Sequence, residues 1–161
     1  AVKTAADRDA LRAGLLDGSV DVVATDHAPH TLEEKERPYA NAPSGGPLVQ
    51  HSLPMMLELS AQGVLPVETV VEKMCHAPAR LFGVRDRGFL RTGHFADIVL
   101  VRPADPWTVS KENILYKCGW SPLEGPAFSH RVVRTLVNGR TVYADGRVDT
   151  AHRGAELEFD R

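Results

Sequence analysis

The spacing of hydrophobic residues near the start of the chain predicts a helix followed by a buried strand. Thr4 and Asp7 precede leucines spaced four residues apart, and Gly18 follows them. A capping residue, a helical repeat and a terminal glycine together predict a helix from about residue 5 to 17. The next run, VDVVAT at residues 20–25, is short, β-branched and almost continuously apolar. This pattern is typical of a parallel strand that is buried on both faces.

Helical spacing resumes beyond a long polar stretch. Residues 31–47 carry charges and then Pro, Asn, Ser and Gly, which predicts an irregular loop of a length that is usually functional. Apolar residues predict a helix over about 48–61, with Pro54 tolerated only near its start or at a kink. A further helix opens at Pro66, runs for about ten residues and is followed by a helical turn over 79–82.

The periodicity changes in the second half of the chain, which predicts short strands. Asn138-Gly139 and Asp145-Gly146 are two-residue signals of tight hairpins. Residues 102–130 are rich in Pro, Gly and aromatic residues, and we predict that they are mostly loop. The predicted strands are 96–101, 132–137, 141–144 and 147–149.

Composition and charge exclude several classes of protein. The chain has 161 residues, of which 43% are hydrophobic, and this is enough for a core of one-domain size. Its 19 basic and 21 acidic residues give a net charge of −2 without clustering, so we expect no nucleic-acid partner. Because no apolar stretch is long enough to span a bilayer, we expect no membrane partner and a cytoplasmic location. Two distant cysteines, Cys75 and Cys118, give neither a disulfide framework nor a thiolate zinc site.

Asp26 stands where the predicted strand 20–25 ends. The carboxyl ends of parallel strands carry the active site in α/β folds. A carboxylate there can bind a divalent metal or move a proton, and His30 could reach a ligand from the loop that follows. On spacing alone, Asp26 is as well explained by capping the turn that begins at Ala28-Pro29, which is the commoner role of an Asp before such a turn. Since His27 alternates to the opposite side of the strand, we expect it to be structural.

These residues belong to a longer pattern that resembles the dihydroorotases of the amidohydrolase superfamily, and the resemblance covers nearly the whole chain. Its most specific part is the run from Thr25 to His30, because hydantoinases and allantoinases share only the Asp-His pair. The later GxxADIVL pattern is common to the superfamily. The matching stretches are TDHAPH at 25–30, EEK at 33–35, APSGG at 42–46, HAPA at 76–79, GHFADIVL at 93–100, WSP at 120–122 and VNG at 137–139.

The resemblance implies an α/β fold, namely the C-terminal fragment of a (β/α)8 TIM-barrel metal-dependent hydrolase plus part of a small β-sandwich domain. Residues 1–83 would hold the last barrel strand, the DHAPH loop and the following helices, and residues 84–161 would form a strand-rich composite domain. The activity implied is that of a binuclear zinc enzyme in de novo pyrimidine biosynthesis. It would hydrolyse L-dihydroorotate reversibly to N-carbamoyl-L-aspartate.

The resemblance also implies roles for individual residues. Asp26 would ligate one zinc, take the proton from a metal-bound hydroxide and deliver it to the leaving nitrogen. His30 matches the family histidine that binds the substrate carboxylate. Ser44 and Gly45 match two loop positions whose backbone touches the substrate. Many relatives carry an aromatic residue at the position of Ser44, so only the backbone role is carried over.

Several parts of the family pattern have no counterpart in this chain. A barrel of this type needs roughly 250 residues, and the sequence offers one credible barrel strand. The His-x-His pair, the bridging ligand and two further histidine ligands of the family are not matched, and the chain opens with Ala1. We therefore expect the C-terminal third of a dihydroorotase. Since a catalytic zinc needs about three protein ligands, the isolated chain is expected to be inactive and metal-poor.

Two other functions remain open. A hydantoinase-like or dihydropyrimidinase-like cyclic amidase would share the fold, but a neutral hydantoin would give His30 no carboxylate to bind. A non-catalytic homologue could instead be a structural partner of aspartate transcarbamoylase, and the retained Asp26 speaks against this reading without excluding it. The family resemblance also suggests a homodimer.

Overall fold

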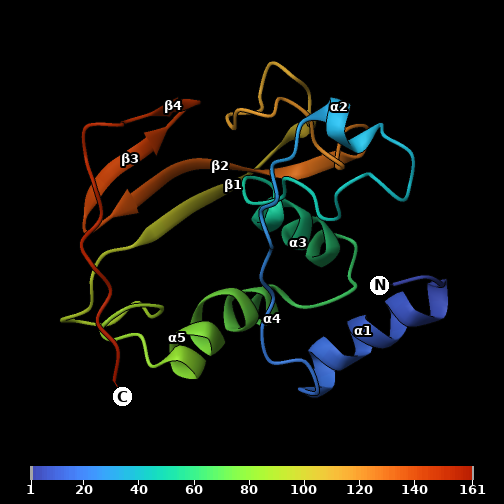
Figure 1. Cartoon of the computed structure of the whole chain (residues 1–161). Helices are drawn as coiled ribbons and strands as arrows, with labels where there is room; N and C mark the ends of the chain where they lie inside the picture. The colour runs from blue at the N-terminus through green and yellow to red at the C-terminus, as the bar shows by residue number, and fades with distance from the viewer. Residues whose placement is uncertain (1, 161) are drawn as a thin grey trace. The chain divides into compact units, whose positions relative to one another are not determined.

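A computed structural model describes residues 2–160 (Figure 1). All of its helices precede residue 84 and all of its named strands follow it. The helical elements are α1 (Ala5–Asp17), α2 (Leu32–Lys35), α3 (Ser52–Ala61), α4 (Val67–Val71), the π-helical segment η1 (Glu72–His76) and α5 (Ala77–Phe82). The strands are β1 (Ile98–Thr108), β2 (Ala127–Val137), β3 (Arg140–Ala144) and β4 (Arg147–Val148). The helices end close to residue 83, where we predicted a domain boundary from the sequence. The boundary itself stays a prediction.

Contacts divide the chain into two compact units. Unit 1 comprises the residues up to Val23, Leu59–Arg102 and the residues from Val132 onward. Unit 2 comprises Ala24–Glu58 and Pro103–Arg131. The strands β1 and β2 each run from one unit into the other. Unit 2 contains every residue that the sequence nominates for the functional site.

Helix α1 confirms the prediction made from its capping residues. The Thr4 side chain accepts a hydrogen bond from the Asp7 backbone N–H at 3.1 Å, and the Asp7 carboxylate accepts one from the Thr4 N–H at 2.8 Å. These reciprocal bonds satisfy backbone donors that the first turn of a helix leaves free. The helix ends at Gly18, whose φ of 88° places it in the left-handed region.

The strand predicted over 20–25 is wrong for the described residues, because this segment has no regular secondary structure. A strand needs a ladder of hydrogen bonds to a neighbour, and no named strand lies before residue 98. The segment is held instead by the helical region. Val23 N–H donates to the Lys73 carbonyl at 3.0 Å, and the Lys73 ammonium donates to the Val20 carbonyl at 2.5 Å.

The middle helices broadly follow the prediction. Helix α3 begins at Ser52, four residues later than the predicted start at 48, and Pro54 lies in its first turn, where its missing N–H costs nothing. After Pro66 the chain is helical through α4, η1 and α5 and stops at Gly83, which has a φ of 62°. The predicted loop over 31–47 is wrong at one point, since it contains the short helix α2.

Both predicted hairpin turns are present. Asn138 and Gly139 have φ values of 51° and 78°, and Asp145 and Gly146 have values of 47° and 84°. Two consecutive residues with positive φ are the property of a type I′ turn, whose twist suits a two-residue hairpin. Accordingly β2 pairs antiparallel with β3, and β3 pairs antiparallel with β4.

The first two strands are longer than the sequence predicts. The sheet has the order β1-β2-β3-β4, and β1 and β2 extend into the stretch 102–130 that we predicted to be mostly loop. The prediction failed at 102–108 because two prolines interrupt the pattern there. Pro103 and Pro106 fit in β1 because it lies at the edge of this sheet, where a strand can lack backbone donors on one side.

Buried Arg87 anchors the turn between β2 and β3 within unit 1. It is 8% exposed, forms an ion pair with Asp97 and donates to the Asn138 side-chain oxygen at 3.0 Å. The Asn138 backbone N–H donates to Asp97 at 2.8 Å. A buried guanidinium is costly unless it is paired, and this network supplies both a charge partner and polar acceptors.

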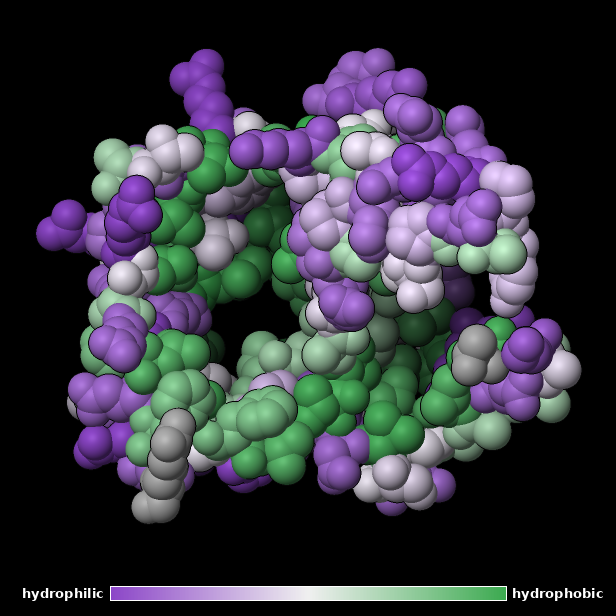
Figure 2. All heavy atoms as spheres, in the orientation of Figure 1, coloured by the Kyte–Doolittle hydropathy of each residue, from purple (hydrophilic) through white to green (hydrophobic). Residues whose placement is uncertain are grey.

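Two of the three valines of α4 are left exposed by the described residues. Val70 is 1% exposed, whereas Val67 and Val71 are 47% and 41% exposed. Figure 2 shows hydrophobic side chains gathered over α4. No helix within residues 2–160 combines the length and the apolar character needed to cross a bilayer.

His51 occupies an aromatic environment in the core of unit 2. It is 1% exposed, and its ring centroid lies 6.4 Å from that of Trp107 and 6.1 Å from that of Tyr116. Neither ring nitrogen has a hydrogen-bond partner among the described residues. Burial without a charged neighbour lowers the pKa of His51 from its ordinary value.

This environment predicts a pH-dependent stability. A lowered pKa in the folded state means that the unfolded chain binds the His51 proton at a higher pH, so stability falls as the pH drops below about 6.5. One such group changes the free energy of unfolding by at most about 1.4 kcal/mol per pH unit. We expect urea unfolding between pH 7.5 and 5.5 to show this loss, and His51→Leu to flatten it. Equal slopes for both proteins would contradict the prediction.

Candidate functional site

Asp26 and His30 lie on one irregular segment of unit 2. Asp26 is exposed and His30 is half-buried. The backbone is fixed locally, because His30 N–H donates to the Ala28 carbonyl at 2.9 Å and Ala28 N–H donates to the Gly46 carbonyl at 3.2 Å. The second bond connects the segment of the two nominated residues to the loop that carries Ser44 and Gly45.

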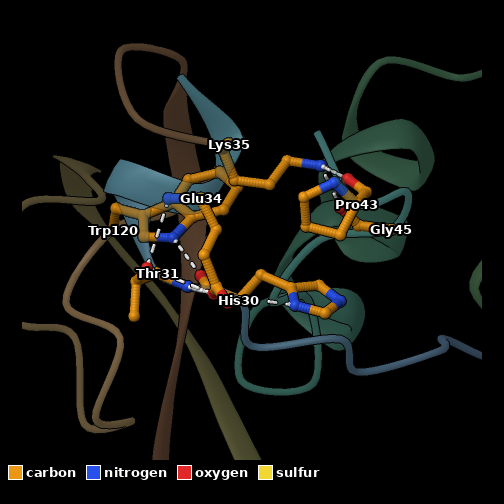
Figure 3. Close-up of polar contacts among 7 residues, drawn as sticks. All are labelled: His30, Thr31, Glu34, Lys35, Pro43, Gly45 and Trp120. Carbon is orange, nitrogen blue, oxygen red and sulfur yellow. Dashed lines mark hydrogen bonds and ion pairs between the residues drawn. The ribbon is translucent and has the colours of Figure 1, made fainter. Parts of the chain in front are cut away.

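Helix α2 starts immediately after His30 and presents a carboxylate to it (Figure 3). Thr31 and Glu34 form a reciprocal cap, with the Thr31 N–H donating to Glu34 at 2.8 Å and the Glu34 N–H donating to the Thr31 hydroxyl at 3.3 Å. Hydrogen bonds from the backbone and then the side chain of Thr31 lower the pKa of Glu34. The same carboxylate lies 3.8 Å from His30 Nδ1. The cap therefore keeps a negative charge beside the imidazole.

Trp120 fixes the backbone of His30 from a distant part of the sequence. Its indole Nε1 donates to the His30 carbonyl at 2.8 Å (Figure 3). Indole is only a donor, so this bond needs a backbone acceptor at that point. His30 is thus held through its carbonyl by Trp120, and its ring is left facing Glu34.

Lys35 joins α2 to the loop that carries Ser44 and Gly45. Its ammonium donates to the Pro43 carbonyl at 2.6 Å and to the Gly45 carbonyl at 2.9 Å, as Figure 3 shows. Ser44, between these two acceptors, is exposed. The backbone carbonyls on both sides of Ser44 are consequently held by hydrogen bonds from Lys35.

Gly45 is a position where a side chain does not fit. Its φ is +83°, and a Cβ placed on it would lie 2.7 Å from the Cβ of Ala28. That separation is well inside van der Waals contact. The close approach of the two segments therefore requires glycine at 45.

A cavity of about 500 Å³ adjoins the DHAPH segment within unit 2. His27 lines it, accepts a long hydrogen bond of 3.5 Å from the Val49 N–H at Nδ1, and packs edge-on against Tyr116 with centroids 5.3 Å apart. The remaining lining residues are Pro29, Thr31, Leu115, Tyr116, Lys117 and Cys118. These contacts show His27 in packing interactions. The structural role that we expect for His27 stays a prediction.

The described residues do not by themselves make a metal site. Within residues 2–160 no group of three or more His, Cys, Asp or Glu side chains is placed so that it could hold a metal ion. Asp26 is the one described residue nominated as a ligand, and a single carboxylate does not satisfy a catalytic zinc. The assignment of Asp26 to metal binding stays a prediction.

Lys35 and Trp120 belong to stretches that match the family pattern, but sequence reasoning gave them no role, and the structure shows that they hold His30 and the loop of Ser44 and Gly45. A local signal existed for part of this, since Thr31-x-x-Glu34 is a capping-box pattern and predicts a helix start directly after His30. No local signal could pair Trp120 with His30, because they lie 90 positions apart.

Comparison with known proteins places these residues in a family context. The sequence model of the amidohydrolase family matches residues 50–143 of this chain. The chain is similar to a protein named dihydroorotase from Pelobacter propionicus, with 42% identity over 142 residues, covering 88% of this chain and 33% of the relative. It is similar to a dihydroorotase from Halobacterium salinarum, with 41% identity over 150 residues, covering 93% of this chain and 35% of the relative. The chain thus spans about a third of the length of these relatives.

Solved structures agree on the fold. The chain resembles L-hydantoinase (dihydropyrimidinase) from Arthrobacter aurescens with a TM-score of 0.84 and 31% identity, covering 92% of this chain and 34% of that one. It resembles a D-hydantoinase from a Bacillus species with a TM-score of 0.83 and 26% identity, covering 92% and 34%. These likenesses confirm the predicted fold class, the α/β fold of a barrel hydrolase of this superfamily, over the part that the chain represents.

The packing at Gly45 can be tested by substitution. We expect Gly45→Ala to lower the free energy of unfolding by about 2–4 kcal/mol, because it adds a steric clash with Ala28 to the cost of a left-handed backbone. Gly63→Ala is a matched control, since Gly63 has a φ of +72° but no atom within 4 Å of its added Cβ. It should cost only about 1 kcal/mol. Equal losses in urea unfolding of the two variants would show that the contact with Ala28 is unimportant.

Proposed function

Because the chain belongs to the amidohydrolase family, we propose that its protein is a dihydroorotase, which hydrolyses L-dihydroorotate reversibly to N-carbamoyl-L-aspartate in pyrimidine biosynthesis. The similarity to proteins of that name carries the proposal. A matched stretch of 142 residues within 161 must include residues 20–142, so it contains every nominated site residue. We propose a cytoplasmic location on the same grounds.

The chemistry assigned to Asp26 is proton transfer. Ring opening joins a water oxygen to the carbonyl carbon, breaks the carbon–nitrogen bond and leaves a proton on the departing nitrogen. An exposed carboxylate can accept the proton from the attacking water and deliver it to that nitrogen. Zinc, which the family resemblance implies, would lower the pKa of a bound water to about 7.

His30 and the 43–46 loop would bind and orient the substrate. Dihydroorotate carries a carboxylate, and the half-buried imidazole of His30 offers a hydrogen-bond donor that such a group can use. The backbone at Ser44 and Gly45 would contact the ring. An exposed backbone between two anchored carbonyls supports this role, because it offers polar groups in a fixed arrangement.

A second candidate is a hydantoinase or dihydropyrimidinase activity. The likeness to solved structures of those names favours it, with TM-scores of 0.83 and 0.84. Against it stands the higher sequence identity to dihydroorotases, 42% compared with 31%. A non-catalytic homologue that pairs with aspartate transcarbamoylase and a homodimeric enzyme are further proposals, which activity and mass measurements would test.

Substrate preference distinguishes these functions. The protein encoded by the complete gene, purified with zinc, should hydrolyse dihydroorotate with a kcat/KM at least about 100-fold above that for unsubstituted hydantoin, because only the former has a carboxylate for His30. A preference for hydantoin would favour the second candidate. Absence of turnover on both would favour the non-catalytic homologue.

Asp26→Asn tests the proton-transfer role. Loss of a general acid–base typically lowers kcat by about 10²–10⁴, and we expect that loss for dihydroorotate hydrolysis. Asp21→Asn is the control, since Asp21 is an exposed carboxylate five residues earlier and is not assigned to the site. The role fails if Asp26→Asn retains the kcat of Asp21→Asn.

A further inference from the structure

Lys35 has no part in the proposed chemistry, yet it makes two hydrogen bonds to the loop that is proposed to contact the substrate. Its Nζ lies 2.6 Å from the Pro43 carbonyl and 2.9 Å from the Gly45 carbonyl, and the side chain is half-buried. An ammonium carries three donors and no acceptor, so it can serve two carbonyls at once. Hydrogen bonds from a charged donor are also stronger than those from a neutral one.

The backbone of the loop has no regular secondary structure to hold it, and besides Lys35 the hydroxyl of Tyr116 donates to it, at the Pro47 carbonyl. Residues 43–48 contain no helix or strand. The backbone bond recorded between this loop and the DHAPH segment is the one from Ala28 N–H to the Gly46 carbonyl, at 3.2 Å. Gly45 makes the close approach to Ala28 sterically possible but does not hold it. The ammonium of Lys35 adds two stronger hydrogen bonds to the backbone of this loop, one on each side of Ser44.

Helix α2 contacts both His30 and the 43–46 loop, the two parts that are proposed to bind the substrate. Its first turn presents Glu34 to His30 at 3.8 Å, and its last residue, Lys35, holds the loop (Figure 3). Both contacts come from neighbouring residues of a single turn. If Lys35 released the loop, the distance between the loop backbone and His30 would therefore change.

We propose that Lys35 is a positioning residue that sets the 43–46 loop against His30, so that a substrate bearing a ring amide and a carboxylate meets both together. The substrate class rests on the proposed function, whereas the positioning rests on the contacts of Lys35. Since Lys35 does not touch the reacting atoms in this arrangement, its loss should impair binding more than chemistry.

Steady-state kinetics on the protein encoded by the complete gene test this inference. Lys35→Met should raise KM for dihydroorotate about tenfold and change kcat less than about threefold, because binding geometry and not proton transfer is lost. Lys35→Arg can still donate to both carbonyls and should restore KM to within about threefold. An unchanged KM in Lys35→Met would overturn the proposal.

Lys73→Met is the matched control. Lys73 also donates its ammonium to a backbone carbonyl, that of Val20, at 2.5 Å, but it belongs to unit 1. If the effect of Lys35 were one of general stability, Lys73→Met would raise KM similarly. That result would overturn the positioning role.

A measurement without substrate separates this proposal from the proposed function. Hydrogen exchange of the Ala28 amide reports the bond to Gly46 directly. Exchange should be about tenfold faster in Lys35→Met than in the wild type and unchanged in Lys73→Met. If the wild type turned over neither dihydroorotate nor hydantoin, the proposed function would fail. The exchange rate of the Ala28 amide would still show whether Lys35 positions the loop. Should Lys35→Met not fold, Lys35→Gln is measured in the same way. Its two N–H donors are uncharged and lie on a side chain one atom shorter, so exchange should still be faster than in the wild type, and wild-type exchange in it would refute the positioning role.

Discussion

Hydrogen bonds from side chains to backbone carbonyls hold much of the candidate site together, and the placement of His30, Ser44 and Gly45 depends on them. Residues 21–31 and 43–48 have no helix or strand, so they lack the ladder that normally satisfies backbone polar groups. Lys35 serves two carbonyls of the loop and Trp120 serves that of His30. Tyr116 donates to the Pro47 carbonyl at 3.2 Å. The irregular backbone of the site is therefore fixed from outside itself.

The chemical character of these supporting groups suits that task. An indole N–H does not lose its proton near neutral pH, and burial raises the pKa of Tyr116 above its ordinary value. Trp120 and Tyr116 therefore keep the protons that they donate to the backbone over the range in which an Asp or a His titrates. The bonds that these two residues make therefore do not depend on the protonation of a nearby Asp or His.

Local signals predicted the elements whose geometry is decided locally. The reciprocal bonds of Thr4 and Asp7 and the positive φ of Asn138 concern residues within a few positions of each other, and both predictions were confirmed. The strand expected at 20–25 depends on neighbours that the described residues do not provide. The length of β1 depends on its edge position, which makes Pro103 acceptable. Such features are set by tertiary context and not by the pattern of one segment.

The candidate site likewise has features that a local sequence pattern predicts and features that depend on tertiary contacts. Asp26 and His30 could be nominated because their residue types and spacing carry a motif. The supporting roles of Trp120 and Lys35 could not be assigned in this way. Trp120 lies 90 positions from His30, and Lys35 acts through main-chain carbonyls, which every residue type carries. A motif records which atoms meet the substrate. The atoms that place them need only a donor at the right point, and many sequences can supply one.

The two histidines of unit 2 show how environment decides role when residue type does not. His51 is enclosed by aromatic rings, has no hydrogen-bond partner among the described residues and has a lowered pKa, so it acts as an apolar ring in the core. His30 is half-buried, 3.8 Å from Glu34, and held through its backbone by Trp120. Its ring can exchange one anionic partner for another, because the backbone bond does not depend on where the imidazole points. The carboxylate binding that we propose for His30 requires that exchange, whereas the aromatic rings around His51 leave no room for such a partner there.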